Sequence, residues 1–434
     1  MNLPPLNLAL LTTSILCHSS SPVHADERPN VILIVADDIG CDWVSCYGAE
    51  HRTPNVDRLA REGVRYETAW CTPSSMPSQV TLLTGQYPFR HGWTGDHNVA
   101  QQGAKELSSD KFTTLARALS ASGYVAVVGG QWQVNRLPEQ SNALKKHGFD
   151  EHCVYTNFKS QKLKNQAQNS SSQIMTNGRL SSFPNGPQTI NSFLIDFITR
   201  PRAQPFLVYY PMILTGPATA SPRSDSNASG TSADDALRFA EAVTHMDQLV
   251  GELIDAVDKA GLRQNTLILF TSDNGSAVAG SFDGKPFEAG KGSKSDSGAH
   301  VPFIVRAPFL TEGGRVSRDL IDATDLYPTS LELAQVDPLR DRELDGRSFL
   351  PSLRGSEDPF EKRNWIYSQL GEFRMIRDWQ HILDSDGNFH DLTKDPLQQS
   401  EVSLLDKIAP GRRQRLEMIL KRLPKDAPVP FGAR

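Results

Sequence analysis

An unbroken apolar run near the N-terminus, Val31-Ile32-Leu33-Ile34-Val35-Ala36, limits what this chain can fold into. The run has the length of a strand, and it lacks the alternation of polar and apolar residues that a half-exposed strand shows. Strands that are buried on both faces occur in parallel sheets with helices packed on either side. The run therefore predicts a central strand of an α/β domain.

The segments that follow alternate between helical and strand patterns. Residues 53–63 begin with Thr-Pro and end with Gly, which is the pattern of a capped helix. Further helices are predicted at 113–122 and 233–260, strands at 124–128, 206–210, 266–270 and 303–306, and a turn at Gly129-Gly130. This alternation predicts an α/β fold with a doubly wound, mostly parallel sheet flanked by helices.

Composition and charge exclude some classes of partner. The 434 residues are 38% hydrophobic and 22% charged, as in soluble globular proteins, and the net charge is only -5. A charge this small supports neither nucleic-acid binding nor a membrane-surface patch. No membrane span is expected, because the apolar segment 6–16 is far shorter than the roughly 20 residues that a span needs.

The same N-terminal segment predicts export. It is followed by polar residues and by Val23-His24-Ala25, a small-residue site of the kind that signal peptidase cleaves. We expect residues 1–25 to be a signal peptide and the protein to be periplasmic or secreted; the alternative is an irregular N-terminus of a cytosolic protein. Removal of this segment leaves four cysteines, too few for a disulfide framework in a long chain, although one bridge stays open.

Oxygen-bearing side chains directly follow two of the predicted strands. Asp37 and Asp38 come after the first apolar run, and Asp273 and Asn274 come after the strand at 266–270. Ligands bind at the carboxyl ends of strands in open α/β sheets, and the two pairs converge if their strands are neighbours. Adjacent carboxylates are costly unless a cation neutralises them, which favours Ca²⁺ or Mg²⁺. The alternative is a pair of solvated turns.

The stretch from Cys71 to Gly85 carries the candidate nucleophile. Its first part is rich in Cys, Pro and Ser, which disfavours a strand, and a short helix is predicted for Pro77 to Thr84. Ser75 lies at the entrance of this helix, where backbone N–H groups and the helix dipole favour an anion. Ser75 is therefore expected to meet the ligand.

The stretch 66–92 resembles the signature of the sulfatase family, whose fold is alkaline phosphatase-like. The family motif reads Cys or Ser, any residue, Pro, any residue and Arg, followed by Leu-Thr-Gly. Leu83-Thr84-Gly85 sets the register, which puts the nucleophile at Ser75 and the motif proline at Pro77. Cys71 does not fit, because its own frame would require Arg at position 75. The resemblance implies that this residue type is oxidised to formylglycine in working members.

The resemblance extends from residue 30 to about residue 405 and implies a cofactor and a partner. The family's calcium site, with one ion, matches Asp37, Asp38, Asp273 and Asn274 residue for residue. The segment 287–302 matches a block in which the lysine, here Lys291, contacts the sulfate. The implied partner is a sulfated or otherwise anionic small molecule or saccharide. His300 in the same block is expected to be structural rather than catalytic.

The C-terminal part resembles the small α+β subdomain of sulfatases, a short antiparallel sheet with a closing helix. The matching segments are 346–350 and 387–396, and the helix is expected at 410–423. We therefore divide the chain into the signal peptide, a main α/β domain at 26–345 and a subdomain at 346–434. The polar stretch 154–187 and the Ser/Ala/Gly/Pro tract 216–233 are predicted to be surface loops that decide specificity.

Four positions depart from the family pattern. The motif arginine falls on Gln79, the lysine and histidine of the Gly-Lys-Trp-His block fall on Gln131 and Gln133, and a histidine before proline falls on Gly216. Each change removes a cation or a proton donor. The loss of one preorganised donor typically costs about a hundredfold or more in rate. Fast hydrolysis of sulfate esters is therefore not expected.

Three functions remain open at this stage. The first is a working sulfuric ester hydrolase with a weakened site. The second is a catalytically impaired homologue, a candidate pseudoenzyme, that binds calcium and an anionic glycan. The third is a phosphatase or phosphodiesterase that uses unmodified Ser75. This class commonly has two metals with His ligands, and Asn274 occupies a position where a His ligand of the second metal would be expected, which disfavours this class. Both states of Ser75 stay open, and the absence of the motif arginine favours plain serine over formylglycine.

Overall fold

The structure, a computed structural model, describes most of the chain. The described residues are 28–96, 105–137, 139–140, 142–155, 172–213, 233–282, 284–337, 343–394, 398 and 410–423. The predicted signal peptide and Gly216, with nearly all of the tract 216–233, lie outside these ranges. Within them, no helix combines the length and the apolar character that crossing a bilayer requires.

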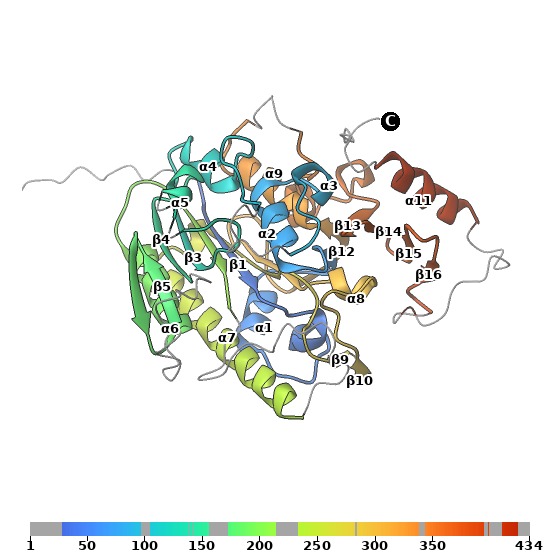
Figure 1. The fold of residues 1–434 in the computed structure, drawn as a ribbon, viewed down its shortest axis with the longest axis horizontal. Coiled ribbons are helices and arrows are strands. Elements are labelled where there is room, and N and C mark those ends of the chain that lie inside the picture. The colour runs from blue at the N-terminus through green and yellow to red at the C-terminus, as the bar shows by residue number, and fades with distance from the viewer. Residues whose placement is uncertain are drawn as a thin grey trace, which may run out of the picture.

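A ten-stranded sheet forms the centre of the described structure (Figure 1). From one edge to the other its strands are β12 (Arg315–Asp322), β2 (Val64–Trp70), β11 (Phe303–Arg306), β8 (Thr266–Ser272), β1 (Asn30–Ala36), β7 (Phe206–Pro211), β3 (Val125–Gln131), β4 (Glu151–Tyr155), β5 (Ser172–Thr176) and β6 (Arg179–Phe183). Pairing is parallel except where β11 lies between β2 and β8 and where β5 and β6 extend the sheet beyond β4. The predicted doubly wound, mostly parallel sheet is confirmed.

Helices cover both faces of this sheet. One face carries α1 (Pro54–Glu62), α6 (Gly186–Thr199) and α7 (Ala233–Lys259), and the other carries α2 (Ser75–Thr84), α4 (Leu115–Ser120) and α9 (Leu326–Leu333). Alternate residues of β1 enter the two cores, with Ile32 and Ile34 on the α7 side and Val31 and Leu33 on the α2 side. Burial on both sides explains why β1 is apolar throughout.

Short elements complete the main part of the fold. They are the helices α3 (Pro88–His91), α5 (Ala143–Lys146), α8 (Asp296–Ala299) and α10 (Leu350–Leu353) and the hairpin of β9 (Gly280–Phe282) and β10 (Lys285–Phe287). All four described cysteines, Cys41, Cys46, Cys71 and Cys153, are free, so no disulfide forms among them. The fold of this part therefore depends on packing and hydrogen bonds.

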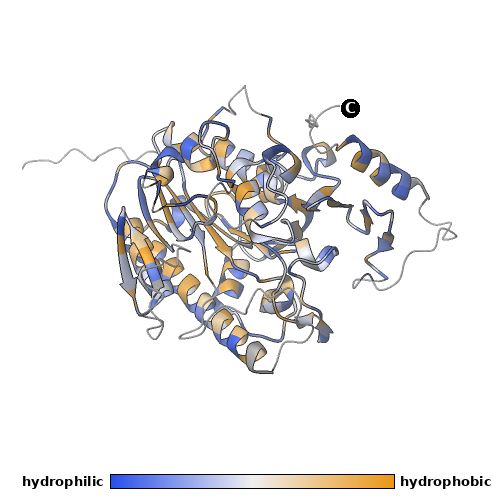
Figure 2. Ribbon diagram, viewed as in Figure 1, coloured by the Kyte–Doolittle hydropathy of each residue, from blue (hydrophilic) through white to orange (hydrophobic). Residues whose placement is uncertain are grey.

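A small antiparallel sheet follows near the C-terminus. Its strands are β13 (Ile366–Leu370), β14 (Phe373–Arg377), β15 (His381–Asp384) and β16 (Phe389–Asp391), and α11 (Pro410–Arg422) packs on them. Figure 2 shows the central strands of the large sheet mostly in hydrophobic colours, whereas α11 is largely hydrophilic. Tyr87 and Phe89 of the main part share a core with this sheet. The domain boundary at residue 345 stays a prediction.

The turn predicted at Gly129-Gly130 is wrong, because both residues belong to β3. Gly130 has φ +121°, and a Cβ there would lie 1.8 Å from the carbonyl oxygen of Pro211 in the neighbouring strand β7. The glycine therefore serves the close approach of two strands and does not reverse the chain.

The surface loop predicted at 154–187 is also wrong in its described part. Residues 154–155 end β4, and residues 172–183 form a hairpin that pairs with β4 and extends the sheet. Ile174 and Met175 are buried, while most of β6 is exposed. The polar composition reflects an edge hairpin with one covered strand. Residues 156–171 lie outside the described ranges.

Candidate functional site

The two predicted polar pairs converge at the carboxyl edge of the large sheet. β1 and β8 are parallel neighbours with Ala36 opposite Ser272, so the residues that follow each strand come together. Ligand oxygens of Asp37, Asp38 and Asp273 lie within 4.8 Å of one another. Among the described residues, this is the one cluster of acidic, His or Cys side chains that is close enough for a metal ion. Asp273 is buried, and the two aspartates after β1 are half-buried.

Asp38 is held by contacts from two distant segments of the chain. Its backbone has φ +60°, a left-handed conformation that Asp tolerates better than most residues, and its N–H donates to Asp273 Oδ1 at 3.0 Å. Asn274 Nδ2 donates to Asp38 Oδ1 at 2.9 Å, and Lys291 Nζ donates to Asp38 Oδ2 at 2.6 Å. Three of the predicted metal ligands and the predicted sulfate-contacting lysine therefore share one hydrogen-bonded cluster.

The charges of this cluster perturb one another. Burial, followed by the nearby Asp38 carboxylate, raises the pKa of Asp273 to about 7. Burial opposes the charge of Lys291, but the carboxylates of Asp38, Asp37 and Asp273 outweigh it and raise the pKa of the ammonium. Carboxylates gathered this closely are stabilised by a divalent cation, and Ca²⁺ prefers oxygen ligands of this kind. The donor set therefore fits such an ion.

Ser75 lies beside the cluster. α2 begins at Ser75, two residues before the predicted start, so this serine is in the first turn of the helix. Its side chain is buried, and its hydroxyl donates to Asn274 Oδ1 at 3.0 Å. The amide of Asn274 thus connects Ser75 to Asp38. The candidate nucleophile and the candidate metal ligands are in direct contact.

A residue that the sequence reasoning missed also reaches the start of α2. Asp96 Oδ1 accepts a hydrogen bond from the backbone N–H of Met76 at 3.0 Å. The contact joins residues that are twenty positions apart, and Asp96 follows a Gly-rich turn without any local pattern that marks a site. Only the three-dimensional structure places it here.

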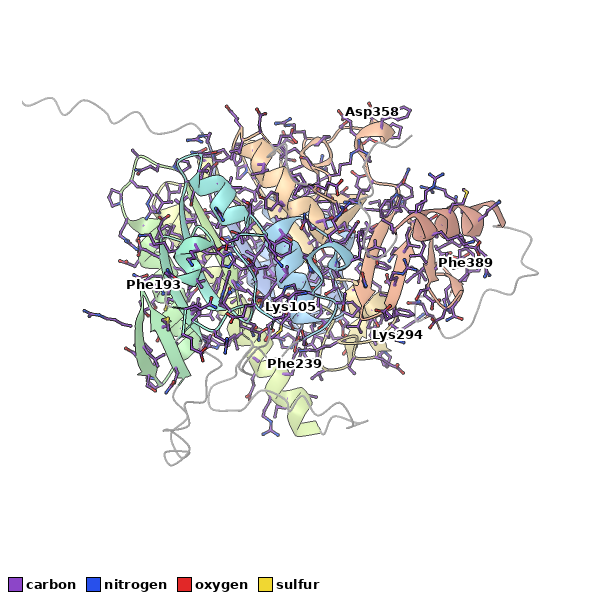
Figure 3. The ribbon with its side chains drawn as sticks, turned by 45° about the horizontal axis from the view of Figure 1, so that its top comes forward. Lys105, Phe193, Phe239, Lys294, Asp358 and Phe389 are labelled. Atoms are coloured by element: carbon purple, nitrogen blue, oxygen red, sulfur yellow. The ribbon has the colours of Figure 1, made fainter. Side chains whose placement is uncertain are left out.

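Three further contacts build the rim of the site. Gly292 N–H donates to the Pro73 carbonyl at 2.8 Å, Ser368 Oγ donates to the Cys71 carbonyl at 2.8 Å, and Gly371 N–H donates to the Thr94 carbonyl at 2.5 Å. Lys294, labelled in Figure 3, holds its ammonium 4.8 Å from the centre of the Phe373 ring. The small C-terminal sheet therefore touches the loops on either side of Ser75.

A comparison with known families decides what kind of scaffold this is. The profile of the family described as Sulfatase matches residues 29–336. The chain belongs to the sulfatase family. Its site cluster lies within the matched residues, and its fold is alkaline phosphatase-like.

Named relatives give this sulfatase-family protein a closer context. N-acetylgalactosamine-6-sulfatase of Canis lupus familiaris is 32% identical over 361 residues, which cover 77% of this chain and 67% of the relative. N-acetylgalactosamine-6-O-sulfatase of Bacteroides thetaiotaomicron is 25% identical over 472 residues, which cover 87% of this chain and 90% of the relative. The crystal structure of Ps i-CgsB has a TM-score of 0.76 at 24% identity and covers 91% of this chain and 92% of its own, a likeness of fold. This chain spans about two thirds of the length of the mammalian relatives.

Three of the four positions that depart from the sulfatase pattern are described. Gln79 is buried within α2, Gln131 is the buried last residue of β3, and Gln133 is half-buried just beyond it. Gln131 Oε1 is buried without a hydrogen-bond partner in the described part of the chain. β7 lies between β1 and β3, and the three strands run parallel. Gln131, the last residue of β3, therefore lies at the same carboxyl end of the sheet as Asp37. All three side chains are uncharged.

His300 occupies a structural position, as the sequence predicted. Its Nδ1 is 3.0 Å from Asp296 Oδ2 and its Nε2 is 2.9 Å from the Glu67 carbonyl. Asp296 also accepts hydrogen bonds from Trp70 Nε1 at 2.8 Å and from Arg377 Nη1 at 2.5 Å. This network joins the small C-terminal sheet to the main part and leaves His300 no ring nitrogen for catalysis.

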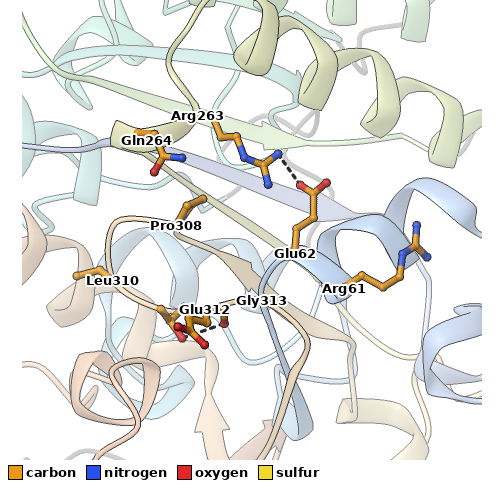
Figure 4. A pocket seen from close by; sticks show the side chains of 9 residues that line it. Arg61, Glu62, Arg263, Gln264, Pro308, Leu310, Glu312 and Gly313 are labelled. Carbon is orange, nitrogen blue, oxygen red and sulfur yellow. Dashed lines mark hydrogen bonds and ion pairs between the residues drawn. The ribbon is translucent and has the colours of Figure 1, made fainter.

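A surface pocket lies away from the carboxylate cluster. It has a volume of ≈ 660 Å³, and Arg61, Glu62, Arg263 and Gly313 are among its lining residues (Figure 4). Arg263, which precedes β8, forms an ion pair with Glu62 at 2.9 Å. Arg263 lies before the N-terminal end of β8, and Asp273 follows its C-terminal end. This pocket is therefore at the end of the strands opposite to the carboxylate cluster. It contains none of the predicted site residues.

Proposed function

We propose that this sulfatase-family protein binds Ca²⁺ at Asp37, Asp38, Asp273 and Asn274 and binds the sulfate group of a sulfated saccharide beside the ion. The observation that carries this proposal is the gathering of three carboxylates within 4.8 Å at a point where Ser75 contacts Asn274. A cation stabilises carboxylates that lie this close together, and positive charge beside the nucleophile stabilises the oxygens of a bound sulfate group. One ion meets both needs.

The proposal assigns a part to the ion and to each residue beside it. A bound Ca²⁺ supplies positive charge for the sulfate oxygens. Lys291, which is already placed against Asp38, supplies a second positive charge and orients the anion. Ser75, or formylglycine formed from it, is the nucleophile. Asn274 keeps the Ser75 side chain directed toward the carboxylate cluster.

We further propose that hydrolysis is slow. Gln79, Gln131 and Gln133 carry no charge at positions where the resemblance implies Arg, Lys and His. A lost donor costs about a hundredfold or more in rate, although such losses are not additive. Binding of the ligand persists under this proposal, because the carboxylates and Lys291 remain. The protein then acts as a slow hydrolase or as a binding protein for sulfated glycans.

The relatives suggest the class of saccharide. The N-acetylgalactosamine-6-sulfatase of Canis lupus familiaris is 32% identical to this chain, and the N-acetylgalactosamine-6-O-sulfatase of Bacteroides thetaiotaomicron is 25% identical. We therefore propose a ligand that contains a sulfated hexosamine. We also propose that the protein is exported, on the basis of the apolar segment 6–16 and the cleavage-type site at 23–25.

The chemical state of Ser75 is tested directly by intact-mass and peptide analysis. Conversion to formylglycine removes two hydrogens from the serine peptide. Formylglycine together with calcium-dependent release of p-nitrophenol from its sulfate ester would establish a working hydrolase. Plain serine without turnover supports the slow or binding role, and turnover of the phosphate ester alone would contradict both.

The metal site is tested by thermal unfolding with and without Ca²⁺. Wild-type protein is expected to melt higher with calcium, since a ligand that binds only the folded state stabilises it. Asp37→Ala should abolish the shift. Asp110→Ala, which changes an exposed aspartate in a surface turn, is the matched control and should retain it. A shift that survives Asp37→Ala would refute the site.

A further inference from the structure

The start of α2 is capped from a distant part of the chain. Ser74, which directly precedes the helix and is of a residue type that often caps, makes no capping hydrogen bond with its side chain. Asp96 instead accepts the N–H of Met76, the residue next to Ser75. A carboxylate therefore occupies a place where a neutral serine was available.

This carboxylate changes the charge next to the nucleophile. The first N–H groups of a helix and its dipole attract anions. The Asp96 carboxylate already accepts one of these N–H groups, so less positive potential is left for a ligand. Asp96 is exposed, and no ion pair joins it to a cation in the described part of the chain. Met76 is next to Ser75, whose hydroxyl contacts Asn274 at the carboxylate cluster, so Asp96 adds negative charge near a group of three aspartates. The ammonium of Lys291 beside that group is bound to Asp38.

We propose that Asp96 is a specificity-determining residue, which makes the Ser75 site discriminate against doubly charged ligands in favour of singly charged ones. The favoured class is the sulfate monoester, with one negative charge, over the phosphate monoester, which carries ≈ -1.5 to -2 near neutral pH. Coulomb repulsion is proportional to the charge of the ligand, so Asp96 disfavours the dianion about twice as strongly in free energy. The inference rests on the proposed binding of the ester group beside Ser75.

Asp96→Asn separates the charge from the cap. Asn caps a helix about as well as Asp, so this variant keeps the hydrogen bond from Met76 and removes only the charge. Asp96→Ala removes both. If Asp96 were only a cap, the melting temperature would fall in the alanine variant, and the asparagine variant would match wild type in stability and in ligand binding.

The measurement is calorimetric titration of p-nitrophenyl sulfate and p-nitrophenyl phosphate at pH 8 with saturating Ca²⁺. In Asp96→Asn we expect the sulfate ester to bind about threefold more tightly and the phosphate ester about tenfold more tightly, because the second factor is roughly the square of the first. Both gains should shrink in about 1 M salt, where the Debye length is about 3 Å.

Three results would overturn the inference. Unchanged affinities for both esters would reduce Asp96 to a helix cap. Equal gains for both esters would show that the residue does not discriminate by charge. If neither ester binds wild type or variant although calcium binds, the proposed binding of the ester group is itself wrong and the inference falls with it.

Discussion

Replacement of Lys291 by methionine tests the cluster through two ligands at once. Methionine has a similar length without the charge. Lys291 Nζ lies 2.6 Å from Asp38 Oδ2, so in wild type the lysine and a bound cation use the same carboxylate. We therefore expect Lys291→Met to bind Ca²⁺ more tightly and a sulfate ester more weakly. The opposite directions distinguish this mechanism from a general loss of structure.

The size of the calcium effect follows from Coulomb's law. Because 38% of the Lys291 side chain is exposed, water-like screening applies. Two unit charges about 4 Å apart interact by about 1 kcal/mol in water, so one lysine and a doubly charged ion repel by about 2 kcal/mol. Since about 1.4 kcal/mol corresponds to tenfold in affinity, removal of the lysine should tighten calcium binding by about 30-fold, and by less at high ionic strength.

The assay is calorimetric titration of chelator-treated protein with Ca²⁺, checked by the dependence of the melting temperature on calcium concentration. Lys294→Met is the matched control. Lys294 lies three residues further along, and its ammonium is held over the Phe373 ring, not against Asp38. We expect this variant to change calcium affinity by less than about threefold, because screened surface charges that do not share a ligand interact weakly.

Unchanged or weaker calcium binding in Lys291→Met would refute the reasoning. It would mean that the ion does not share the Asp38 carboxylate with the lysine. Weaker calcium binding together with a lower melting temperature in the absence of calcium would instead identify Lys291 as a structural support of the loop.

Three further predictions follow from the geometry. Burial and the neighbouring carboxylate raise the pKa of Asp273 to about 7, and a metal ion requires the ionised form of this carboxyl. Calcium affinity should therefore fall by up to about tenfold per pH unit below 7. A flat profile of calcium affinity between pH 8 and 5.5 would contradict this. A triple variant restores the missing cations with the substitutions Gln79→Arg, Gln131→Lys and Gln133→His. It should raise the rate of p-nitrophenyl sulfate hydrolysis by at least about a hundredfold if positive charge is what the site lacks. Arg377→Met should lower the free energy of unfolding by about 1.5–3 kcal/mol, since the buried Asp296 carboxylate loses one cationic donor and keeps Trp70 and His300. Arg318→Met, at an exposed ion pair, should cost less than about 1 kcal/mol in denaturant titrations.

The parts of the site that the sequence predicts are those with a local cause. An apolar strand followed by two carboxylates is visible in the residues 31–38, and the same pattern recurs before Asp273. The convergence of the two pairs required one assumption, that the strands are neighbours, and the pairing of β1 with β8 confirms it. The roles of these residues in binding remain proposals.

The features that the sequence did not predict depend on distant partners. Gly130 resembles a turn residue until the carbonyl of Pro211 is placed beside it. Asp96 becomes relevant only because a loop brings it back to Met76. The polar composition of 172–183 predicts a loop, whereas the structure shows a hairpin that is held by its pairing with β4. In each case the physical reason lies in another segment of the chain.

The contacts of the small C-terminal sheet have a consequence for how this protein can vary. Ser368 and Gly371 bond to the segments that flank Ser75 from a sheet that contributes no side chain to the carboxylate cluster. Substitutions in the turn between β13 and β14 are therefore expected to change the surroundings of Ser75 without changing any residue of the carboxylate cluster. If the proposed function holds, ligand preference and metal affinity are therefore set by different segments of the chain.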